Sequence, residues 1–62
     1  MHIRGLTIQV NTNRRELPER VVNPKAEMTL GDVFKIIEEE HAKAQDIGEA
    51  PTSTTLVVLW GQ

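Results

Sequence analysis

The last apolar run of this chain constrains its fold more than any other feature. Five consecutive residues from Leu56 to Trp60 are apolar, so a strand formed there has no polar face. A strand with one face in water alternates apolar and polar residues, whereas an unbroken apolar run needs cover on both faces. The run therefore predicts either a central strand of a sheet or a strand at a subunit interface.

The length leaves room for one small hydrophobic core. At 62 residues, we expect a single domain over 1–62, with a net stability of about 3–5 kcal/mol. The sequence has no cysteine, which excludes disulfides and the thiolate-based structural zinc sites that often support small domains. Self-association is the simplest remaining way to bury more surface, so we expect a homodimer or another oligomer.

Two strands are predicted in the first third of the chain. Residues 3–10 alternate between apolar and polar side chains, as expected of a half-buried strand. The polar residues that follow, 11–13, favour a turn. A return strand over 19–22 is then expected at a sheet edge, because Pro18 lacks the N–H donor that a central strand needs.

One helix is predicted over 30–47. Thr29 is a suitable N-cap with Asp32 as its capping partner, while Gly48 and Pro51 favour termination. The face expected to pack on a sheet has helical spacing and consists of Leu30, Val33, Phe34, Ile37, His41 and Ala44.

The third strand is predicted over 54–60, which gives the order strand, strand, helix, strand. The handedness of crossover connections would then place the last strand parallel to the first and beside it. The predicted fold class is α+β: one helix packed on a three-stranded mixed sheet, with the C-terminal strand central and the fold completed by oligomerisation.

This order, with the capped helix start Thr29–Val33, resembles a minimal ubiquitin-like β-grasp. The resemblance concerns the architecture. Sulfur-carrier and conjugated members of that group end in a reactive Gly-Gly, whereas this chain ends Trp60-Gly61-Gln62. The resemblance therefore implies no carrier role and transfers no active residue.

The closing strand also supplies the predicted interface residues. Leu56, Val58 and Trp60 share one face, and Val57 and Leu59 share the other. One set meets the helix, so Val57 and Leu59 are candidates for contact with a partner. Trp60 is a candidate binding hot spot, although a core tryptophan that closes one end of the barrel or sheet is the slightly favoured interpretation.

Charge is unevenly distributed along the chain. The net charge is -2, with about +3 over residues 1–25 and about -5 over the rest. Arg14, Arg15 and Arg20, with Lys25, form a candidate electrostatic contact for an acidic protein or a nucleic acid. A solvated hairpin is the alternative, and the sequence offers few aromatic residues for base stacking.

No motif in the sequence predicts catalysis. Ser53 is the only serine, and no glycine-rich loop surrounds a hydroxyl group. The Glu38–His41 spacing occurs once, whereas di-iron bundles need two such motifs and further carboxylates. We therefore expect no enzyme, no catalytic or metal-binding residue, and no cofactor.

The predicted function is that of a small non-enzymatic protein-interaction module: an adaptor, an inhibitor or an accessory subunit. It would bind itself or a larger protein stoichiometrically, through an apolar sheet face or a sheet edge. Two alternatives are a dimeric nucleic-acid-binding regulator that uses the basic hairpin, and a subunit that completes the active site of a larger enzyme. The sequence contains no apolar stretch of about 18 residues and no signal-peptide pattern, so we expect a cytoplasmic protein without a membrane partner.

Overall fold

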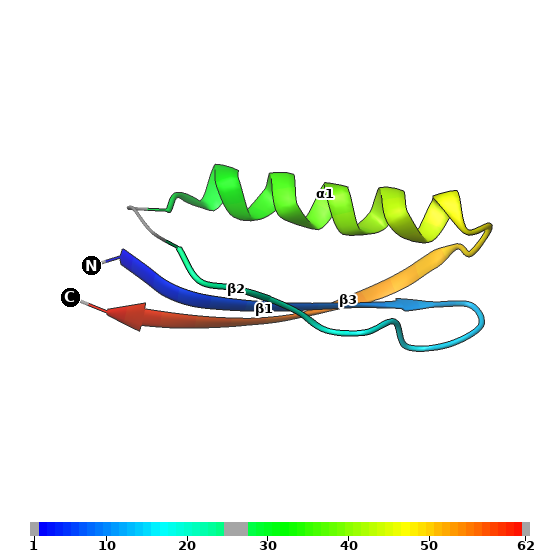
Figure 1. Ribbon diagram of the computed structural model, residues 1–62, viewed down its shortest axis with the longest axis horizontal. Coiled ribbons are helices and arrows are strands. Elements are labelled where there is room, and N and C mark those ends of the chain that lie inside the picture. Colours follow the sequence, from blue (N-terminus) through cyan, green and yellow to red (C-terminus); the bar gives the residue numbers. More distant parts are fainter. Residues whose placement is uncertain (1, 25–27, 62) are drawn as a thin grey trace.

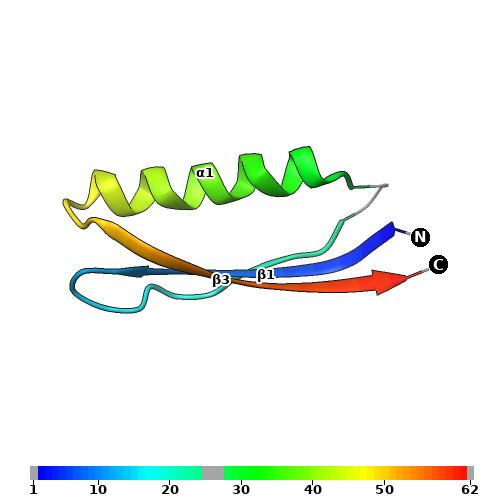
Figure 2. The ribbon, with the colours of Figure 1, turned by 180° about the vertical axis from the view of Figure 1, so that it is seen from behind.

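The computed structural model describes residues 2–24 and 28–61. Its elements are β1 (His2–Thr12), β2 (Arg20–Val22), α1 (Leu30–Asp46) and β3 (Pro51–Gly61). The helix covers one face of a three-stranded sheet and leaves the other face bare (Figures 1 and 2). The predicted α+β class, the order of elements and the packing of one helix on three strands are confirmed.

The order and direction of the strands correct the prediction. The sheet order is β2-β1-β3, and β3 is antiparallel to β1. The predicted mixed sheet, the central position of the C-terminal strand and the β-grasp-like parallel pairing are therefore wrong. The hairpin reverses the chain, and α1 carries it back along the length of β1 (Figure 1), so β3 must return antiparallel to β1. The helical crossover joins β2 to β3, with β1 between them.

β1 is the central strand of the sheet, and its apolar residues alternate towards α1. Leu6, Ile8 and Val10 are all buried beneath the helix. A register shift between Ile3 and Gly5 marks a bulge, which returns Ile3 to the same face as Leu6 despite the odd spacing. Ile3 is consequently a core residue.

β2 is short, as the position of Pro18 predicts. It pairs with β1 through three residues, Arg20–Val22, while an isolated bridge joins Asn11 to Glu16 further along the hairpin. Pro18 lies between these two paired stretches, where no backbone donor is needed. An edge strand was predicted over 19–22, and the structure places it at 20–22.

The helix begins and ends where its local signals predict. The Asp32 N–H donates to Thr29 Oγ1 (3.3 Å) and the Thr29 N–H donates to Asp32 Oδ2 (3.1 Å), which completes a capping box. Asp32 Oδ2 accepts hydrogen bonds from the Thr29 N–H and the Thr29 hydroxyl (3.1 Å each). These two bonds hold the pKa of Asp32 below its ordinary value against the opposing effect of burial, and Lys35 adds a smaller attraction. At the other end Gly48 has a φ of 77°, a conformation that glycine adopts without strain.

The buried face of α1 is narrower than predicted. Val33 and Ala44 are buried, but Leu30 and Phe34, which we expected to face the sheet, are 59% and 62% exposed. The helix packs on β1 and β3, and a sheet of three strands is too narrow to cover the whole apolar stripe. Two large side chains of that stripe therefore remain in solvent.

The molecule is elongated, with principal extents of 39 × 15 × 15 Å. His2 pairs with Gly61 in the sheet, so the first and last described residues lie at one end. The same end carries the start of α1, while the hairpin tip and the α1–β3 loop lie at the other (Figure 1).

Candidate protein interface

β3 is an unprotected edge strand. It has eleven residues, none of them charged, and only β1 pairs with it among residues 2–24 and 28–61. Natural edge strands are usually blocked by lysines, prolines or bulges, or are kept very short. In β3 such features occur only at its polar start, where Pro51 is the first residue and a register shift leaves Thr52 as an extra residue opposite β1. The outer row of backbone donors and acceptors is thus open to another strand.

The apolar residues of β3 are exposed on both faces of the sheet. Leu59 is 62% exposed, Trp60 55%, Val57 49% and Leu56 42%. Val58 is only partly exposed, since it packs against the core. The apolar run predicted to need cover on both faces therefore lacks that cover within the described chain, and the interpretation of Trp60 as a core residue is wrong.

The predicted interface residues lie on one strand but not on one face. Val57 pairs with Thr7 and Leu59 with Gly5 on the bare face, whereas Trp60 pairs with Ile3 on the helix face. A Cβ atom at Gly5 would lie 3.1 Å from Leu59 Cδ1. Because Gly5 has no side chain, the Leu59 side chain can lie directly over the backbone of β1 at this position.

The helix extends this apolar surface. His41 Nε2 lies 2.7 Å from Thr54 Oγ1, which fixes one flank of α1 over β3. Leu30, Phe34 and Ile37 precede His41 at intervals of three or four residues, so they share that flank. Both Leu30 and Phe34 belong to the first turns of α1, and α1 begins at the end of the molecule where β3 finishes (Figure 1). We call these two residues, together with Leu56, Val57, Leu59 and Trp60, the β3 edge surface.

Sequence reasoning missed the helical part of this surface. It assigned Leu30 and Phe34 to the core because their spacing matches the buried stripe. The available signal was the breadth of that stripe, which exceeds what three strands can cover.

The predicted basic hairpin is largely neutralised within the fold. Arg15 Nη2 lies 2.9 Å from Glu49 Oε2, and Arg20 Nη1 lies 2.8 Å from Glu40 Oε2 and 3.6 Å from Glu39 Oε1. Arg14 is exposed and has no ion pair among the residues that the structure describes. Lys25, the remaining predicted member, lies outside the described residues.

Glu49 joins the two loops at the far end of the molecule. It is 7% exposed and accepts hydrogen bonds from Thr12 Oγ1 (2.8 Å) and Arg15 Nη2 (2.9 Å). The hydrogen bond from Thr12, followed by that from Arg15, holds the pKa of Glu49 below its ordinary value. The backbone adds a hydrogen bond from the Asn13 N–H to the Ala50 carbonyl (3.0 Å). This network gives Arg15 a structural role.

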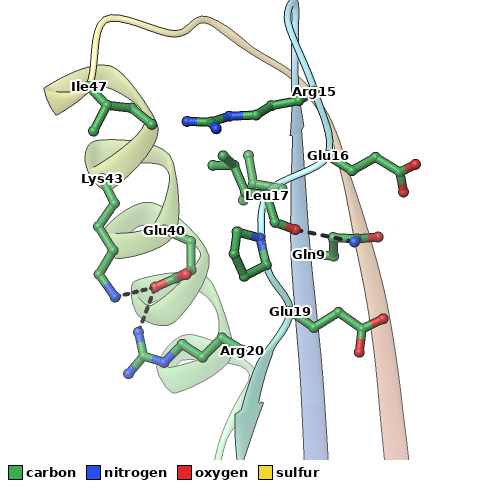
Figure 3. Close-up of a pocket in the computed structure, with 11 residues that line it drawn as sticks. Gln9, Arg15, Glu16, Leu17, Glu19, Arg20, Glu40, Lys43 and Ile47 are labelled. Carbon is green, nitrogen blue, oxygen red and sulfur yellow. Dashed lines mark hydrogen bonds and ion pairs between the residues drawn. The ribbon is translucent and has the colours of Figure 1, made fainter.

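A groove of about 860 Å³ separates the 15–20 segment from the C-terminal half of α1 (Figure 3). Its charged groups neutralise one another, because Arg20 Nη1 and Lys43 Nζ each lie 2.8 Å from Glu40 Oε2. Partial burial alone would raise the pKa of Glu40, but hydrogen bonds from Lys43 and Arg20 outweigh it and lower that pKa. Glu16 and Glu19 point away from the helix (Figure 3). The lining contains no histidine, serine or cysteine, so it offers no nucleophile paired with a base.

The described ranges also contain no group of three or more His, Cys, Asp or Glu side chains able to hold a metal ion. His41 contacts Thr54, across the helix–sheet interface. Among the described residues, no helix is long and apolar enough to span a bilayer.

Comparison with protein-family models, with curated proteins and with solved structures finds no match. The candidate interface is therefore interpreted from its own geometry.

Proposed function

We propose that this chain is a non-enzymatic protein-interaction module that binds its partner stoichiometrically through the β3 edge surface. The observation that carries the proposal is the eleven-residue, uncharged edge strand whose apolar side chains are exposed on both faces. Exposed apolar surface of this extent is typical of binding sites.

Strand addition is the mechanism that suits this surface. A partner strand would take up the free backbone groups of β3, and its alternate side chains would contact each face. On the helix face these contacts would include Trp60 and Phe34, and on the bare face Leu59. Large aromatic side chains in such positions usually supply much of the binding free energy.

The chain offers a matched pair of variants for the test. Leu59 on β3 and Val21 on β2 are 62% and 64% exposed and lie on the same bare face, at opposite edges of the sheet. Wild type, Leu59→Lys and Val21→Lys would each be immobilised through a cysteine introduced at Arg14, at the end of the molecule away from Trp60. They would be used to capture partners, including a copy of the chain that carries a dye at the same position. We expect a partner retained at fixed stoichiometry by wild type and Val21→Lys, and lost with Leu59→Lys. Retention that is indifferent to Leu59→Lys would contradict the proposal.

The alternatives from the sequence gain less support. Nucleic-acid binding needs several free cations, and Arg15 and Arg20 are already paired with glutamates. A subunit that completes another enzyme's active site would bind through the same edge. The capture experiment would reveal this function if the captured partner is an enzyme. The cytoplasmic location stays a prediction from the sequence.

A further inference from the structure

We infer that the partner at the β3 edge surface is a second copy of this chain, paired antiparallel through β3 about Val58. The inference rests on the proposed function and identifies its partner. Two copies would form a continuous six-stranded sheet with the order β2-β1-β3-β3-β1-β2 and both helices on one side.

The sequence of β3 is self-complementary in only one region. Its first half is polar, from Thr52 to Thr55, and its second half is apolar, from Leu56 to Trp60. A two-fold axis at Val58 sets Val57 opposite the partner's Leu59, and Leu56 opposite the partner's Trp60. An axis near Leu56 would instead oppose threonines to valines. Apolar and aromatic cross-strand pairs are the stabilising ones, so the pattern selects Val58.

The absence of charge in β3 removes the usual obstacle to self-pairing. In an isologous contact each side chain meets its own kind or a neighbour from the same segment. A single lysine or glutamate near the axis would therefore meet its copy, which is destabilising. Because no residue of β3 is charged, this register creates no such pair.

In this dimer the exposed flanks of the two α1 helices would face each other across the two-fold axis at Val58. Strands lie about 4.8 Å apart, so helices above β1 or between β1 and β3 would be separated by roughly 10–14 Å across the new sheet. Direct helix packing occurs at about 8–10 Å, and large side chains can fill the difference. Leu30 and Phe34 are exposed on this flank, close to the end of the molecule where β3 carries its apolar run.

The pairing closes at two copies. The outer strands of the dimer would be β2, which has three residues and is flanked by Pro18 and Pro24. Such an edge is a poor template for a further strand. A discrete dimer is therefore expected in place of a growing sheet.

The exposed area is consistent with this contact. A compact folded monomer of 7.0 kDa has about 4,000 Å² of accessible surface, whereas this chain has 4496 Å². The excess is comparable with the roughly 600 Å² that each partner contributes to the smallest stable interfaces.

Sedimentation equilibrium at micromolar concentration tests the association. We expect a mass of about 14 kDa, twice the 7.0 kDa of one chain, and at least a ~30-fold weaker dimer for Leu59→Lys, as for loss of a hot spot. Val21→Lys should dimerise like wild type.

Single cysteines test the register, since the chain has none of its own. Val58→Cys should form an intermolecular disulfide under mild oxidation, because the two positions face each other across the axis at about 4.5–5.5 Å between Cα atoms. Thr55→Cys is the control, as its copies would lie roughly 20 Å apart along the strands. If Val58→Cys disturbs the core, two exposed positions can be used in its place. A mixture of the Val57→Cys and Leu59→Cys variants should form a disulfide between the two variants.

The outcomes separate this inference from the proposed function. A monomer at hundred-micromolar concentration, or cross-linking no greater at position 58 than at 55, overturns the β3 dimer. If the capture experiment still yields a different protein that depends on Leu59, the interaction module stands and only its partner changes. If neither self-association nor Leu59-dependent capture occurs, both proposals fall.

Discussion

At the scale of single residues, Glu49 has the most consequential environment in the fold. Its carboxylate is buried and accepts hydrogen bonds from Thr12 and Arg15, which are 37 and 34 positions away in the chain. One side chain thus connects the hairpin tip to the loop that leads into β3. The network orders the end of the molecule opposite the β3 edge surface.

Glu49→Gln should lower the melting temperature at pH 7 and remove part of the acid sensitivity. Because folding lowers the pKa of Glu49, its contribution is complete above the ordinary glutamate pKa. It is lost as the pH falls from about 4.5 through the folded-state value. The difference between wild type and variant should therefore narrow below about pH 4.5.

Thermal unfolding followed by circular dichroism between pH 7 and pH 2 measures this difference. Glu19→Gln is the control, since Glu19 is exposed and has no ion pair among the described residues. A difference between wild type and Glu49→Gln that does not change with pH would show that the carboxylate charge is unimportant.

At the scale of elements, α1 packs on the sheet with one face and exposes apolar residues of a neighbouring face to solvent. Val33 and Ala44 are buried, while Phe34 and Leu30 lie exposed on the flank that His41 ties to β3. The apolar stripe of the helix is therefore wider than the fold of one chain requires. The unused part is what we assign to the partner.

Phe34→Lys should weaken association about tenfold or more and leave the fold intact. Phe34 is 62% exposed, and substitutions at such positions usually change the stability of a monomer by less than about 0.5 kcal/mol. Ile47→Lys is the matched control, because Ile47 is 54% exposed and lies at the C-cap of α1, where it lines the groove. Sedimentation reports the dimer affinity and circular dichroism the folding. Equal effects of the two variants would exclude α1 from the interface.

Elements with local signals could be predicted from the sequence, and long-range pairings could not. The capping box at Thr29, Gly48 at the C-terminal end and the alternation of β1 all act within a few residues, and each element is found close to its predicted position. The direction of β3 depends on how α1 returns the chain, and its predicted parallel pairing with β1 and central position are wrong.

The candidate site shows the same division. The predicted interface residues Val57, Leu59 and Trp60 are exposed, and their contact with a partner stays a prediction. The internal pairing of Arg15 and Arg20 involves residues 19 or more positions away. No spacing rule in the sequence could have indicated it.

At the scale of the whole molecule, a chain with 39 Å of length and 15 Å of thickness has little interior. Its core cluster contains Ile3, Leu6, Ile8 and Val33, so stability should depend on what covers the remaining apolar surface. Association would then be part of folding stability.

The melting temperature should rise with chain concentration, by roughly 3–6 °C for each tenfold increase, if the native state is a dimer. Because β3 is uncharged, added salt should not weaken the dimer, whereas contacts made by the basic hairpin would be screened. Differential scanning calorimetry at two concentrations and two salt levels measures both effects. A concentration-independent transition would identify a stable monomer.

The pairing of His2 with Gly61 has a practical consequence for handling this protein. Any affinity tag or fluorescent fusion attached at either terminus would emerge next to Trp60 and obstruct docking. Reporter groups belong at the far end instead, for example a dye on a cysteine introduced at Arg14. A bulky terminal extension would make the protein look inert for steric reasons alone.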